Sequence, residues 1–108
     1  MKIINVNTTL TGRELLYHLT QRLNPLFQQQ RESDLVFKIE KVGEAVEISH
    51  PEMYEGFLFR IEIQGNELFI TRSEHYVDDV NSLTLESILN KLFEDLAGKK
   101  GVKIMLEG

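Results

Sequence analysis

The sequence predicts an α+β fold: a two-layer sandwich in which two helices pack on one face of a mostly antiparallel sheet, in the order β-α-β-β-β-β-α-β. Two segments carry apolar residues at helical spacing, and the stretch between them alternates apolar and polar residues around two glycine-containing turns. Short β-branched segments stand near both ends of the chain. Because each helix has one apolar stripe and each central strand one apolar face, a two-layer arrangement buries both.

Composition limits the classes of protein. A chain of 108 residues has the length of one domain, so we expect residues 1–108 to form a single α+β domain. The absence of cysteine excludes disulfides and cysteine-ligated metal centres. The formal net charge of -5 repels nucleic acid and anionic membranes, and no apolar run approaches the ~20 residues that cross a bilayer. We therefore expect a soluble cytoplasmic protein that binds neither.

The first helix follows a short strand over residues 2–6. Thr11 and Glu14 have the spacing of a capping box, in which each side chain accepts a hydrogen bond from the other residue's backbone. Pro25 is expected to end or bend this helix near Asn24, because the residue before a proline avoids the helical region. The predicted apolar stripe comprises Leu15, Leu16, Leu19, Leu23 and then Leu26 or Phe27.

The second helix is predicted over residues 82–98. Ser82 or Thr84 is expected to cap its start, and Gly98 suits its end. A final strand is predicted over residues 102–106, and terminal strands are expected at edges of the sheet, where they invite pairing with another chain. The apolar stripe of this helix comprises Leu85, Ile88, Leu89, Leu92, Phe93 and Leu96.

Two hairpins fill the middle of the chain. A tight turn at Val42-Gly43 predicts the first register, which pairs Phe37 with Ile48, Ile39 with Val46 and Lys38 with Glu47. A turn at Gly65-Asn66 predicts the second, which pairs Ile63 with Leu68 and Ile61 with Ile70. The order of the strands in the sheet stays open.

Two loops should meet at one end of the sheet, because the second register places Ser73 opposite Leu58. Loops 50–56 and 74–79 then bring together two histidines and several carboxylates, a combination that suits zinc, manganese or non-haem iron or acid–base catalysis. The candidate metal ligands are His50, His75, Asp78 and Asp79. The alternative is structural: the aspartates precede a helix start, where carboxylates are favoured, and the spacing His75-x-x-Asp78 matches no metal signature.

The sheet face away from the helices is the candidate interface. Apolar side chains at Val36, Leu58 and Phe69 are expected among charges such as Arg60, and Tyr54 and Tyr76 extend them at the loop end. The alternative is a solvated antiparallel sheet. Because no catalytic or cofactor motif occurs, the leading hypothesis is a small non-catalytic binding or adaptor domain that contacts a protein partner or a second copy of itself. The second hypothesis is a metal-dependent protein that holds a divalent metal ion between loops 50–56 and 74–79.

Overall fold

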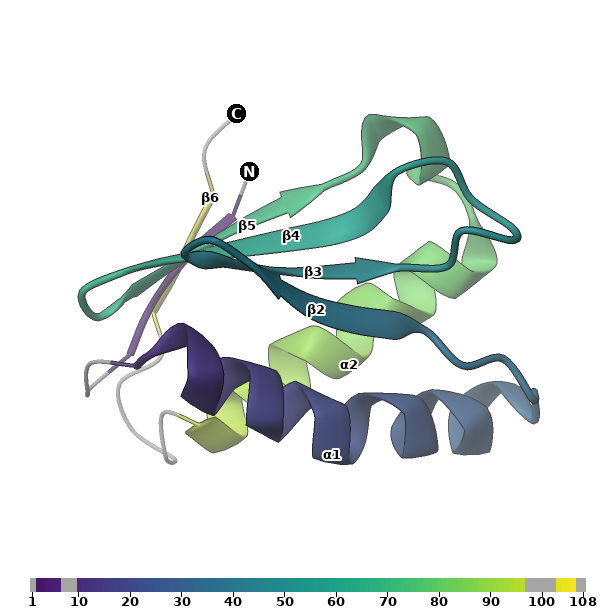
Figure 1. Cartoon of the computed structure of the whole chain (residues 1–108), viewed down its shortest axis with the longest axis horizontal. Coiled ribbons are helices and arrows are strands. Elements are labelled where there is room, and N and C mark those ends of the chain that lie inside the picture. The colour runs from purple at the N-terminus through teal and green to yellow at the C-terminus, as the bar shows by residue number, and fades with distance from the viewer. Residues whose placement is uncertain (1, 7–9, 97–102, 107–108) are drawn as a thin grey trace.

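A computed structural model describes residues 2–6, 10–96 and 103–106. Its elements follow the predicted order, and the strands among these residues form an antiparallel sheet in the order β2-β3-β4-β5-β1-β6 (Figure 1). The α+β prediction is confirmed. The elements are β1 (Lys2–Asn5), α1 (Gly12–Arg31), β2 (Lys38–Val42), β3 (Ala45–Ser49), β4 (Phe57–Gln64), β5 (Glu67–Arg72), a short 3-10 turn (Glu74–Tyr76), α2 (Val80–Leu96) and β6 (Lys103–Leu106).

Both helices lie on one face of the sheet, and the hydrophobic core fills the space between the two layers (Figure 1). The four-strand meander from β2 to β5 occupies one side of the sheet. The two hairpins predict its β2–β3 and β4–β5 pairs, and the structure settles the open order by pairing β3 with β4. The prediction that the N-terminal strand lies at an edge is wrong: β1 pairs with both β5 and β6. The helical core residues are Leu15, Leu19, Leu23, Phe27, Leu85, Ile88, Leu89, Leu92 and Phe93.

Helix α1 begins as predicted and ends later than predicted. Thr11 Oγ1 accepts from the Glu14 amide, and the Thr11 amide donates to Glu14 Oε1, both at 3.1 Å, which completes the capping box. Of the two predicted effects of Pro25, an end or a bend, the end is wrong, since α1 continues to Arg31. The ring of Pro25 lies on the exposed side, whereas Phe27 is buried in the core. Burial of the last turns therefore outweighs the backbone hydrogen bond that proline cannot donate.

Helix α2 begins two residues before the predicted cap. The Asp79 carboxylate accepts from the amides of Asn81 and Ser82 at 2.9 and 3.0 Å, so Asp79 caps the helix. Ser82 and Thr84 were predicted in this role and do not have it. The Ser82 side chain is buried, and the Thr84 hydroxyl donates to the carbonyl of Val80 at 2.8 Å. The predicted stop at Gly98 lies outside the described residues, as do the side chain of Leu96 and the residue Val102.

The second hairpin has the predicted register, whereas the first is shifted. Ile61 pairs with Ile70 and Ile63 with Leu68. In the first hairpin the turn is Gly43-Glu44, so that Ile39 pairs with Ile48 and Lys38 with Ser49. Gly43 has a φ of 61°, which favours glycine at the first turn position. The shift moves each pairing by two residues, so the apolar residues keep the predicted face.

A bulge interrupts β4 at Leu58. Phe59 pairs with Ile48 and Phe57 with Ser49, which leaves Leu58 as an extra residue. Alternation fails at this point, and Leu58 belongs to the buried core cluster instead of the uncovered sheet face.

Candidate functional site

Loops 50–56 and 74–79 emerge at the same end of the sheet, as the second hairpin predicts. The Ser73 amide donates to the Leu58 carbonyl at 2.9 Å, which confirms that register. Tyr54 is buried, and its hydroxyl donates to Asp79 Oδ1 at 2.9 Å and accepts from Asn81 Nδ2 at 3.0 Å. Burial raises the pKa of the Tyr54 phenol, and the neighbouring Asp79 adds to that shift, which the Asn81 hydrogen bond opposes. The loop and the start of α2 are therefore locked together.

Tyr76 joins the two loops at a second point. Its hydroxyl accepts from the Glu55 amide at 2.7 Å, and its ring meets the Tyr54 ring edge-on, with 4.8 Å between centroids. His75 lies beside it in the 3-10 turn and is exposed. The two tyrosines thus connect the loops, and Tyr54 is buried while Tyr76 stays partly exposed.

The structure does not bring the predicted metal ligands together. His50 and His75 line different pockets, Asp79 is committed to the helix cap and to Tyr54, and Asp78 is exposed. Across residues 2–6, 10–96 and 103–106 there is no group of three or more histidine, aspartate or glutamate side chains that could hold a metal ion. The four predicted ligands do share one end of the molecule, but their side chains do not converge.

The predicted apolar centre of the uncovered sheet face is also smaller than expected. Leu58 and Tyr54 are buried in the core, and of the predicted apolar residues Phe69 remains at the middle of that face, where it is half-buried and pairs with Glu62 and with Ile3 of β1. Arg60 binds the carboxylates of Glu62 and Glu47, and the hydrogen bonds to Glu62 and then to Glu47 raise the pKa of its guanidinium. These contacts describe a sheet surface on which ion-paired charges flank Phe69 and its neighbour Ile3.

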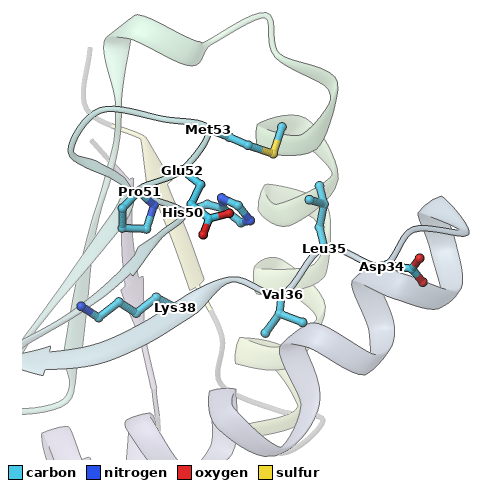
Figure 2. Close-up of a pocket in the computed structure, with 8 residues that line it drawn as sticks. All are labelled: Asp34, Leu35, Val36, Lys38, His50, Pro51, Glu52 and Met53. Carbon is cyan, nitrogen blue, oxygen red and sulfur yellow. The ribbon is translucent and has the colours of Figure 1, made fainter.

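Val36, the remaining residue of the predicted interface, lies in a different setting: a groove at the point where β2 and β3 separate. We call it the strand groove. It has a volume of about 510 Å³. Figure 2 shows the extended connection before β2 on one side, the turn after β3 on the other, and the His50 ring between them. The lining residues are Asp34, Leu35, Val36, Lys38, His50, Pro51, Glu52 and Met53.

Helix α1 holds one wall of the strand groove. The Asn24 side chain accepts from the Phe37 amide at 2.7 Å and donates to the Phe37 carbonyl at 3.1 Å, as a neighbouring strand would. Gln28 donates to the Leu35 carbonyl at 3.1 Å. The connection before β2 is thereby attached to the helix instead of to the chain that leaves β3.

The turn after β3 forms the other wall. The His50 carbonyl accepts from the amides of Met53 and Tyr54 at 3.0 and 2.9 Å, so the chain curls away from the sheet directly after the strand. Met53 projects from this turn with 50% of its surface exposed, and Val36 across the groove is 62% exposed. Large apolar side chains exposed to this degree on both sides of one hollow suit contact with another molecule.

Leu35 and His50 are the partly buried members of the lining and form the floor of the strand groove. The His50 ring packs edge-on against Phe37, with 5.7 Å between centroids. Its Nδ1 atom is buried and makes no hydrogen bond to any residue that the structure describes. Buried polar atoms are normally paired, so this nitrogen is an exception among the described residues.

The backbone of Val36 is open as well. Successive residues of an extended chain direct their amides and carbonyls to opposite sides, and those of Phe37 face the Asn24 side chain. Those of Val36 therefore face the turn, and neither group is hydrogen-bonded within the described part of the chain.

The strand groove is locally acidic. Lys38 pairs with Glu40 at 3.4 Å, whereas Asp34 and Glu52 form no ion pair with any described residue. Both of these acidic side chains are exposed on the rim. The unpaired charge at the groove is thus negative.

Sequence reasoning recognised Val36 but not the groove. Asn24 and Gln28 create it, and nothing in their spacing distinguishes them from ordinary surface residues of a helix.

Comparison with protein-family models, with curated proteins and with solved structures finds no match for this chain. Among the described residues no helix has both the length and the apolar character needed to cross a membrane.

Proposed function

We propose that this protein is a small non-catalytic binding domain that holds an extended segment of a partner protein in the strand groove. The observation that carries the proposal is the pair of exposed apolar side chains, Val36 and Met53, on either side of a hollow whose floor contains an unsatisfied histidine nitrogen. An apolar side chain of the partner that enters between Val36 and Met53 is shielded from water on both of its sides, which favours binding.

The open backbone of Val36 favours an extended conformation for the bound segment. A strand that runs along the connection before β2 can donate to the Val36 carbonyl and accept from its amide, as in other cases of strand addition. Such pairing stops at Phe37, because Asn24 already occupies the amide and the carbonyl of that residue.

Charge selects among extended segments. Because Asp34 and Glu52 are unpaired within the described residues, a lysine or arginine beside the apolar side chain completes the contact. The preferred ligand is thus a short extended sequence with one large apolar residue and an adjacent basic residue. The metal-dependent alternative has no group of converging ligands to support it in the described residues.

A displayed library of random linear peptides, selected on the purified protein, tests the proposal. The peptides recovered should share an apolar and a basic residue. When such a peptide is added, the NMR chemical shift of the protein's backbone amides should change most at Val36. Met53→Asp should weaken their binding by about tenfold or more, which corresponds to about 1.4 kcal/mol. Val80→Asp is the matched control, since Val80 has the same exposed fraction of 50% and lies at the start of α2, where an acidic residue is tolerated.

Three results count against the proposal. The selection can return no common sequence, the binding can survive Met53→Asp, or Val80→Asp can weaken it equally. Any of these would show that the strand groove is an unused irregularity of the surface.

A further inference from the structure

The outer face of α1 carries a second groove, near the opposite end of this helix from the residues that build the strand groove. We call it the helix groove. It has a volume of about 510 Å³ and is lined by Leu10, Arg13, Glu14, Tyr17, His18 and Arg22. It does not share a lining residue with the strand groove.

Helix α1 is positively charged on a negatively charged protein. Its three arginines and one glutamate give it a formal charge of +2, and since the whole chain carries -5, the rest of the chain carries -7. Two of the three arginines, Arg13 and Arg22, line the helix groove. Most of the positively charged side chains of α1 therefore lie at the helix groove.

Neither of these arginines is neutralised by a carboxylate within the described residues. Arg22 Nη1 lies 2.8 Å from His18 Nδ1, and because a guanidinium can only donate, this nitrogen of His18 accepts. The carboxylate of Glu14 lies in the same groove but already accepts from the Thr11 amide at 3.1 Å. The guanidinium groups thus keep donors for an incoming anionic group.

Tyr17 supplies an apolar surface beside these donors. Its side chain is 66% exposed, although tyrosine normally buries most of its ring. Arg13 lies one turn before Tyr17 on the same side of the helix. An exposed aromatic ring next to arginines that have no carboxylate partner in the described part of the chain is a composition found at the centres of protein interfaces.

We propose that the helix groove binds an acidic segment of a partner protein. Separate carboxylates of that segment pair with Arg13 and with Arg22, each of which can bind both oxygens of one carboxylate, and an apolar or aromatic side chain of the segment covers Tyr17. Nucleic acid and anionic membranes fit less well. Their charge extends beyond two arginines, and within a screening length of about 8 Å it meets the acidic remainder of the protein.

This proposal is independent of the strand groove. Together the two sites would give one small domain a docking surface for a basic segment and another for an acidic segment. Tyr17 and Gln28 are separated by about 17 Å along α1, from a rise of about 1.5 Å per residue.

A labelled peptide with the centre Glu-Glu-Phe-Glu-Glu serves as the probe, and fluorescence polarisation measures its dissociation constant. We expect binding that weakens as salt is added. Arg13→Gln with Arg22→Gln should reduce the affinity about tenfold. The control Arg31→Gln with Lys91→Gln removes the same charge from exposed positions outside the groove and should leave the affinity nearly unchanged. Tyr17→Ser keeps every charge and should still reduce the affinity several-fold.

Each opposing result overturns the proposal. If both double variants lose affinity equally, only the overall charge matters. If Tyr17→Ser binds as well as the wild type, the groove makes no specific contact. If the unmodified protein does not bind the peptide, the partner is not an acidic protein segment. The same conclusion follows if it binds an oligothymidylate or phosphatidylserine vesicles more tightly than the peptide. Met53→Asp should bind this probe normally, so a failure of the strand groove is recognised separately.

Discussion

Tyr54→Phe removes one hydroxyl group and tests how loop 50–56 is held to α2. The hydroxyl donates to Asp79 Oδ1 and accepts from Asn81, at 2.9 and 3.0 Å. A hydrogen bond to a charged group contributes about 1.5–3 kcal/mol to stability. We take the lower end, because the same aspartate oxygen keeps its bonds to the amides of Asn81 and Ser82. The expected loss in the free energy of unfolding is therefore about 1.5 kcal/mol.

This loss is measurable by thermal unfolding. An unfolding entropy of about 2.1 cal/mol/K per residue implies that each kcal/mol shifts the midpoint of this chain by about 4 °C. Tyr54→Phe should lower the midpoint by about 6–7 °C near neutral pH. Tyr17→Phe is the control, since that phenol is largely exposed and should leave the midpoint unchanged.

The effect should also depend on pH. The pKa of Tyr54 in the folded protein is raised above its ordinary value of 10.0, mainly by burial. A group whose pKa rises on folding contributes its full stability below the unfolded pKa and loses it as the pH passes through the folded value. The stability difference between wild type and Tyr54→Phe should thus be constant up to about pH 9 and shrink at higher pH.

A double-mutant cycle separates this bond from other effects of the substitution. Asp79→Ala removes the helix cap and the acceptor of Tyr54 together, so its cost should be smaller by about 1 kcal/mol in the Tyr54→Phe background. If the two losses add to within about 0.3 kcal/mol, the residues are not coupled and the reasoning from the structure is refuted.

Two further predictions concern the end of α1 and the response of the protein to metal ions. Pro25→Ala should raise the free energy of unfolding by about 1–3 kcal/mol, because it restores a backbone hydrogen bond inside a helix that already continues to Arg31; a lower value in urea unfolding would contradict this, and Thr20→Ala on the exposed side is the control. Zinc and manganese should leave the thermal midpoint measured in chelator unchanged. A rise of several degrees that His50→Ala with His75→Ala abolishes would restore the metal hypothesis.

The two hairpins show which part of a register can be read from sequence. Gly65-Asn66 offers one turn position that suits the flanking residues, and the predicted pairs are confirmed. Around Gly43 either two-residue turn places the same apolar residues on the same face, so the hydrophobic pattern cannot distinguish them. The observed turn places glycine at the position with positive φ. The backbone requirement decides this register, and the side-chain pattern does not.

The helix start and the bulge show a second limit. Asp79, Ser82 and Thr84 all have side chains that cap helices, and the choice falls on Asp79 because the buried Tyr54 hydroxyl binds it from another loop. Leu58 occupies a position that alternation assigns to the uncovered face. Leu58 enters the core because a bulge adds one residue to β4 at this point, and no sequence pattern predicts that bulge. Both outcomes depend on tertiary contacts that distant residues supply.

The same kind of contact explains why the sequence predicted Val36 without the groove around it. Asn24 and Gln28 can hold the connection before β2 only if α1 remains helical past Pro25. Had the helix ended near Asn24, as the proline suggests, residues 35–37 would be free to extend β2 alongside the chain that leaves β3, and no gap would separate Val36 from Met53. The continuation of α1 past Pro25 and the strand groove therefore have one cause. Because Phe27 is buried in the core, the helix continues beyond the proline, and Asn24 and Gln28 then lie where a neighbouring strand would otherwise pair.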